Sequence, residues 1–198
     1  MEHDSGSQND CEGRAKEIQE VFSEIQLFVQ THPTVHSPEE LEEFEKKIEQ
    51  KTKRLAGLIT GQVIQDSLAS EEMQREALQF VGSWPRPMRN DGMEYVNIRT
   101  KSGQVVTVRT SYFRRKGKRI FKKRHPGIYP GLILLGIQDR CTPGLASDIS
   151  LLAAAMASFE EVEQVLSGME IHLDINTIRM IAYSFATAAR LMQQESII

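Results

Sequence analysis

The segments MEYVNIRT (93–100), KSG (101–103) and QVVTVRTSYF (104–113) decide the fold class of this chain. Apolar and polar residues alternate in the first and third segments, which is typical of β-strands with one buried face. The Lys-Ser-Gly segment between them supplies turn residues, so the three segments together predict a β-hairpin. Arg99 and Arg109 place positive charge along it.

The residues before the hairpin have a helical period. Between Arg14 and Gln30, apolar residues recur every three or four positions, which is typical of one helical face. The segment that precedes them, 1–13, is polar, and we expect it to form a disordered tail. A signal peptide begins with a basic segment that is followed by an apolar one, whereas this segment is polar and acidic, so it does not have that pattern.

A second helix follows the THPTVH segment, and its start is well marked. Ser37 is a candidate N-cap, Pro38 suits the first helical position, and Glu40 completes a capping box. With a third helix (70–81), these elements predict a helical arm over residues 14–81.

The apolar face of the second helix is more surface than a single helix hides by itself. Its members recur at helical spacing: Leu41, Phe44, Ile48 and Leu55. We expect this face to pair within the chain or with a second copy, so a homo-oligomer through the helical arm is one prediction. A plain helical bundle with a solvated charged face is the alternative.

The residues after the hairpin, 126–198, are helical again. Ser158 and Glu161 form a capping box, and Asp174 is a candidate N-cap for a longer amphipathic helix. A short helix, a tight connection and a longer helix are the layout of a helix-turn-helix domain. The chain is therefore predicted to be mainly α with a small β-hairpin, an α+β fold that runs from helical arm through hairpin to helix-turn-helix.

Charge is divided unevenly along the chain, although its net value is only −3. Residues 1–80 carry 17 acidic and 8 basic residues, and residues 126–198 carry 8 and 3. Residues 81–125 instead carry 2 acidic and 13 basic residues. This asymmetry indicates an anionic partner for the middle of the chain, which holds the β-hairpin and a basic tract (92–125).

The basic tract has eight bases within eleven residues: Arg114, Arg115, Lys116, Lys118, Arg119, Lys122, Lys123 and Arg124. Lys and Arg side chains neutralise phosphates and release counterions, which is the main source of affinity for nucleic acid. With the hairpin arginines, the tract favours double-stranded DNA as the partner. The alternatives are a solvated loop, or a patch for a membrane surface or an acidic protein.

The last helix has a second candidate DNA-binding surface. On its first turns we expect Asn176, Arg179 and Tyr183 to be exposed. Asn and Arg side chains have the geometry to read the edges of adenine and guanine. This part of the chain is acidic overall, which counts against it as the main DNA contact, and the same residues could equally face solvent or a partner domain.

No catalytic, cofactor or metal-binding pattern is found. The histidines are scattered, the paired glutamates lie at helix starts where the helix dipole favours them, and two distant cysteines, Cys11 and Cys141, argue against a disulfide framework or a four-ligand zinc site. Asp139 and Asp148 are interpreted as a turn residue and a helix-surface residue. We expect no enzyme, no cofactor, no metal and, for want of a long apolar run, no membrane segment. The expected location is cytoplasmic.

Two stretches carry a resemblance to a known family. They are GIYPGLILLGIQDRCTPGLASDISLLAAAMASFEEVEQVL (127–166) and IHLDINTIRMIAYSFATAARLMQ (171–193). Both resemble the N-terminal part of insertion-sequence transposases of the ISKra type, and the hairpin at 93–113 is similar to theirs. The resemblance covers about half the chain, from Met93 to Met192, whereas the helical half before it agrees only in type.

The resemblance implies recognition of mobile-element ends in transposition, as a truncated or split transposase located at the nucleoid. Many family members carry cysteine pairs around the hairpin, but here Arg114–Arg124 occupies that place without cysteine, so no metal is carried over. The family's catalytic domain, with acids that bind two metal ions, would follow Ile198. We therefore expect no catalysis in this chain and a separate catalytic transposase partner. A stand-alone DNA-binding regulator and a helical oligomerisation or assembly protein are the alternatives.

Overall fold

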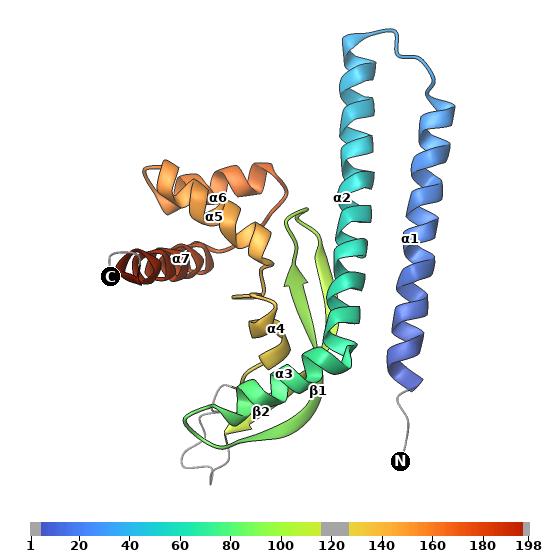
Figure 1. Cartoon of the computed structure of the whole chain (residues 1–198). Helices are drawn as coiled ribbons and strands as arrows, with labels where there is room; N and C mark the ends of the chain where they lie inside the picture. Colours follow the sequence, from blue (N-terminus) through green and yellow to red (C-terminus); the bar gives the residue numbers. More distant parts are fainter. Residues whose placement is uncertain (1–4, 116–126, 196–198) are drawn as a thin grey trace.

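A computed structural model of the chain describes residues 5–115 and 127–195. In these residues the protein is mainly helical, with one two-stranded antiparallel hairpin, so the predicted α+β class is confirmed (Figure 1). The elements are α1 (Ser5–Thr31), α2 (Pro38–Ala69), α3 (Glu71–Gly82), β1 (Met88–Arg99), β2 (Val105–Arg115), α4 (Pro130–Leu134), α5 (Pro143–Ala155), α6 (Phe159–Gly168) and α7 (Ile175–Glu195).

Helices α1 and α2 lie side by side and antiparallel, and we call this pair the arm (Figure 1). Near its tip the rings of Phe28 and Phe44 stack with centroids 5.2 Å apart. Farther along, ion pairs join Glu24 to Lys51 and Glu17 to Arg54. The apolar face expected on the second helix therefore pairs, in part, within the chain.

Two helix starts have a serine N-cap, of which Ser37 was predicted and Ser70 was not. The Ser37 hydroxyl accepts a hydrogen bond from the Glu40 amide, and Ser70 does the same for Met73. The start of α1 is different, because the helix begins at Ser5 inside the segment (1–13) that was expected to be disordered. The prediction is wrong for residues 5–13, since extending an existing helix gains one backbone hydrogen bond per residue and tolerates polar residues.

The predicted hairpin is present, and its strands are antiparallel. Val96 lies opposite Val108 and Ile98 opposite Val106, and all four side chains are buried. The ribbon is longer than predicted, because β1 starts at Met88 rather than near residue 92. A bulge between Asn90 and Met93 allows the extension, and Gly92 supplies the positive φ of 105° that it requires.

One core lies between the ribbon, α2 and α4. Ile64 and Leu68 of α2, together with Leu132 and Ile137, pack on the buried face of the ribbon. Helix α2 comes this close because Gly61 has no side chain. A Cβ added at Gly61 would lie 3.0 Å from the Cβ of Val106. The arm and the hairpin therefore share one core. Leu132 and Ile137, from the start of the predicted C-terminal domain, belong to the same core. The predicted divisions at residues 81–92 and 126 do not follow the packing.

A second core joins α5, α6 and α7 around Leu145, Ile149, Leu166, Ile178 and Ile181. The predicted caps are present here too, since Ser158 accepts from the Glu161 amide and Asp174 from the Thr177 amide. An ion pair between Lys101 in the hairpin turn and Asp148 of α5 ties this helical unit to the ribbon (3.0 Å).

Candidate nucleic-acid interface

The ribbon presents one face to solvent. Its side chains alternate with the buried ones along both strands. Its most exposed members are Met93, Tyr95, Asn97, Val105 and Thr107. The Thr107 hydroxyl donates a hydrogen bond to Oδ1 of Asn97 (2.8 Å), and Tyr95 is 62% exposed. An aromatic ring, an amide and a hydroxyl thus stand together on a flat surface, which suits contact with a polar partner.

Both edges of this ribbon are held by other elements. On the β2 edge, the Gln65 side chain accepts from the Arg109 amide (2.8 Å) and donates to its carbonyl (3.3 Å). The Arg14 guanidinium donates to the carbonyls of Gly61 (3.1 Å) and Thr107 (2.6 Å). These contacts fix the ribbon against the arm, so its exposed face is a rigid platform.

The β1 edge is fastened at its end by the loop before α5. The Arg99 amide donates to the Arg140 carbonyl (2.7 Å), and the Thr142 amide donates to the Arg99 carbonyl (3.0 Å). Asp139 and Arg140 both adopt positive φ, of 48° and 62°. Asp139 is therefore a turn residue, as the sequence suggested, and Arg140 is exposed beside the ribbon.

The first two bases of the basic tract are the last residues of β2. Arg114 is held by an ion pair from its Nε to Asp91 (2.9 Å), and its guanidinium lies 5.1 Å from the centroid of the Tyr112 ring. Asp91 also pairs with Arg89 (3.2 Å). Interaction with Tyr112, and then attraction by Asp91, raise the pKa of Arg114. Arg115 is exposed at the end of the strand.

The chain leaves and re-enters the ribbon at one place. Phe113 exchanges two backbone hydrogen bonds with Ile128 (2.9 and 2.8 Å). Next to this pair, the rings of Tyr112 and Tyr129 lie 4.8 Å apart, and the Tyr129 hydroxyl donates to Glu94 (2.7 Å). Burial, and then the hydrogen bond to Glu94, raise the pKa of Tyr129 to about 12. Residues 113 and 128–129 therefore meet at the open end of the ribbon.

The other six predicted phosphate-binding residues lie between these positions in the sequence. They are Lys116, Lys118, Arg119, Lys122, Lys123 and Arg124, which lie outside the described residues. Arg114 and Arg115 are the two members that the structure places.

The three candidates on the last helix share one face of α7 near its start. Asn176, Arg179 and Tyr183 are all exposed. Phe159, the first residue of α6, contacts two of them: the Arg179 guanidinium lies 5.5 Å from its centroid, and the Tyr183 ring meets it edge-on at 6.2 Å. Met180 completes this face. An aromatic support that holds an arginine outward is a favourable arrangement for reading base edges, because less side-chain freedom is lost on binding.

The connection between α6 and α7 spans residues 169–174. This is longer than the three- or four-residue turn usual in a helix-turn-helix. Glu170 in this connection has a positive φ of 66°, and Ile171 is buried in the core. Helix α7 is further fixed by a hydrogen bond from the Ser184 hydroxyl to Gln138 (2.8 Å).

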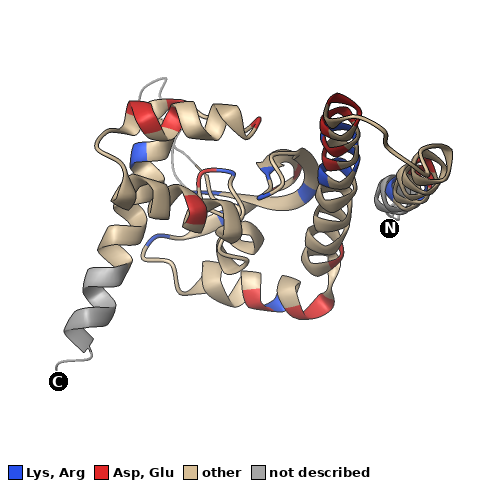
Figure 2. Ribbon diagram, turned by 90° about the horizontal axis from the view of Figure 1, so that it is seen from above, with Lys and Arg blue, Asp and Glu red and all other residues tan. Residues whose placement is uncertain are grey.

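Several acidic residues of the described part lie at helix starts or in ion pairs. The pairs Glu39–Glu40, Glu71–Glu72 and Glu160–Glu161 fall in first turns of helices, where the dipole favours them (Figure 2). Asp148 pairs with Lys101. Within residues 5–115 and 127–195, no three potential ligands come together as a metal would require.

Cys141 is a free, buried thiol. Burial raises its pKa to about 11, and the nearby Arg99 offsets only part of this. At neutral pH the group is a thiol rather than a nucleophilic thiolate, so its place is in the core.

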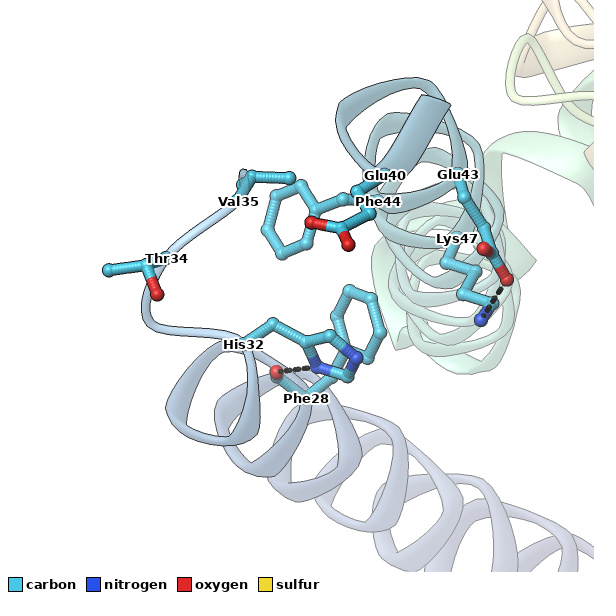
Figure 3. Close-up of a pocket in the computed structure, with 8 residues that line it drawn as sticks. All are labelled: Phe28, His32, Thr34, Val35, Glu40, Glu43, Phe44 and Lys47. Atoms are coloured by element: carbon cyan, nitrogen blue, oxygen red, sulfur yellow. Dashed lines mark hydrogen bonds and ion pairs between the residues drawn. The ribbon is translucent and has the colours of Figure 1, made fainter. Parts of the chain in front are cut away.

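The tip of the arm encloses a pocket of about 260 Å³ (Figure 3). Phe28, His32, Val35 and Phe44 form its apolar walls, as Figure 3 shows. Nδ1 of His32 is hydrogen-bonded to the Phe28 carbonyl (2.9 Å), which holds the imidazole against the helix end. The stacked rings of Phe28 and Phe44 and this hydrogen bond therefore hold the tip of the arm together.

Of the helices in the described ranges, none has the length and apolarity to cross a membrane. No family model, curated protein or solved structure matches this chain.

Sequence reasoning missed two features of the candidate interface. The first is the exposed ribbon face around Tyr95 and Asn97, which the two-residue alternation of the strands could have identified. The second is Phe159, whose contact with Arg179 and Tyr183 depends on how α6 crosses α7. No local pattern in the sequence reports that crossing.

Proposed function

We propose that this chain binds double-stranded DNA and recognises the ends of a mobile element, as the non-catalytic DNA-binding part of a transposase of the ISKra type. A catalytic transposase partner would join it at the nucleoid. The observation that carries the proposal is the placement of charge. The middle of the chain has 13 basic and 2 acidic residues, and Phe113 and Ile128, which lie on either side of its basic tract in the sequence, are joined by two backbone hydrogen bonds.

This arrangement supports phosphate binding for a physical reason. Eight bases within eleven residues are close along the chain, so their fields add. Only Asp91 and Glu94 are acidic in residues 81–125, and Asp91 is already paired with Arg89 and Arg114. The other cations of the tract therefore have few carboxylates near them in the sequence that could compete with phosphates for them.

Sequence reading is assigned to the start of α7. Asn176 and Arg179 have the hydrogen-bonding geometry for adenine and guanine edges, and Phe159 supports Arg179 from behind. Phosphate contacts supply affinity for any DNA, whereas base contacts separate one sequence from another. The two surfaces therefore have separable roles.

The test is to sequence the genomic DNA fragments that remain bound to the purified full chain. We expect the recovered fragments to share a sequence found at mobile-element ends. On that site, Asn176→Ala and Arg179→Ala should each cost about 1–3 kcal/mol, which is about 5- to 150-fold in affinity. Binding to a scrambled duplex should be unchanged. Gln164→Ala, at an exposed position of α6, is the matched control.

Recovered DNA that is no different from the sheared input would contradict sequence-directed binding. A shared sequence at promoters, rather than at element ends, would overturn the transposition role and support a stand-alone regulator. If both α7 variants discriminate between the two duplexes like the parent, α7 does not read bases, and the exposed ribbon face takes that role.

A further inference from the structure

The arm carries a second apolar stripe that the pairing of α1 with α2 leaves uncovered. Its members are Phe22, Val29, Leu41, Ile48, Ile59 and Val63, which we call the outer apolar face. Five of them are large exposed hydrophobic residues, with Phe22 44% and Ile59 45% exposed, and Ile48 is half-buried. A run of apolar side chains along two helices is unusual for a surface without a partner.

Helical geometry places these residues on one side of the arm. On α1, Val21 and Phe28 point inward. Phe22 and Val29 come one residue after them, so each is rotated by about 100° around the helix axis from an inward position. On α2, Leu41 precedes the inward Phe44 by three residues, which turns it by about 60° in the same sense. Because the two helices are antiparallel, equal senses of rotation bring both stripes to the same side.

This side faces away from the rest of the protein. Gly57 and Gly61 are the residues of α2 that approach the hairpin. Ile59 lies two residues from each of them, which is about 200° around the helix. Figure 1 shows in addition that the upper part of the arm extends beyond the other elements. The outer apolar face is thus open over the length of the arm.

Most charges of the arm lie on its other sides. Glu42–Lys46 and Glu43–Lys47 pair along α2, and Glu24–Lys51 and Glu17–Arg54 bridge the two helices. The face itself is interrupted mainly by uncharged residues, namely Ala15, Gln19, Gln26, Thr52 and Ala56. Glu45 and Asp66 are acidic residues within it, because each lies 18 residues, or about five helical turns, from Val63 and Ile48 respectively. Depletion of charge around an apolar centre is the composition of a protein–protein interface.

We propose that the outer apolar face binds the same face of a second copy of this chain, so that two arms form a four-helix bundle. A twofold contact places one surface against itself, and a surface with so little charge does this with little like-charge repulsion. The face is about 30 Å long and two helices, or about 20 Å, wide. Its projected area of about 600 Å² approaches the roughly 800 Å² that each partner contributes to a stable interface.

The test is the oligomeric state of the full chain by sedimentation velocity over the micromolar concentration range. The parent should be a dimer. Phe22→Glu combined with Ile59→Glu should raise the dimer dissociation constant at least about 100-fold, because four charges, two from each chain, would be buried in the contact. Leu27→Glu is the matched control, since Leu27 is 62% exposed but lies on α1 away from this face; it should sediment like the parent.

Circular dichroism shows whether the double variant keeps its helices, and Val63→Glu alone repeats the test at the other end of the face if it does not. A parent that is monomeric throughout the range would overturn the proposal. So would a Leu27→Glu variant that dissociates as readily as the double variant. None of these outcomes depends on DNA, so they are independent of the proposed function.

Discussion

Alanine at Lys122, Lys123 and Arg124 together is expected to lower DNA affinity on the order of 10²- to 10³-fold in 0.1 M salt. Each phosphate contact that a base gives up removes about 0.9 from the slope of log K against log salt. Loss of three contacts should flatten that slope by up to about 3 and weaken binding to all duplexes alike. Fluorescence anisotropy with a labelled duplex over a salt series measures both quantities.

The control removes the same amount of charge elsewhere. Lys16, Lys46 and Lys47 lie in exposed ion pairs along the arm, and replacing all three by alanine should leave the slope at the parent value. Equal losses in the two triple variants would mean that net charge alone, and not the basic tract, governs binding.

Ile178→Ala is expected to lower the free energy of unfolding by about 2–5 kcal/mol, the usual range for removing buried methylene groups. The Ile178 side chain has 0% exposure and packs in the core between α5, α6 and α7. It lies on the same turns of α7 as the candidate base-reading residues, so the two roles of this helix are carried by opposite faces. Urea denaturation followed by circular dichroism measures the change.

Met180→Ala is the companion variant on α7. Met180 is 57% exposed, so its truncation should change the free energy of unfolding by no more than about 0.5 kcal/mol. Similar destabilisation by both substitutions would show that the exposed face of α7 is packed against something else, and would remove it as a candidate DNA contact.

Local signals in the sequence were sufficient for the elements themselves. Ser37, Ser158 and Asp174 were identified as N-caps, and each accepts the expected backbone hydrogen bond. The two-residue alternation predicted the hairpin. These features succeed because caps and strand periodicity depend on residues only a few positions apart.

Features that depend on distant residues were not predicted. The close approach of Gly61 to Val106 brings the arm into the ribbon's core, and Phe113 pairs with Ile128 across the two sides of the basic tract in the sequence. Asp91 was not predicted to pair with Arg89 and Arg114. Each of these contacts depends on how elements pack in space, and the spacing of residues along the chain does not report it.

The central claim is that the middle of this chain binds DNA through phosphate contacts, and the salt dependence of the parent chain on a duplex tests it most directly. If roughly five bases engage, log K should fall against log salt with a slope of about −4 to −5. Between 50 and 200 mM salt, the affinity should then drop several hundred-fold to about a thousand-fold. Absence of binding at low salt, or an affinity that does not change with salt, would contradict the claim.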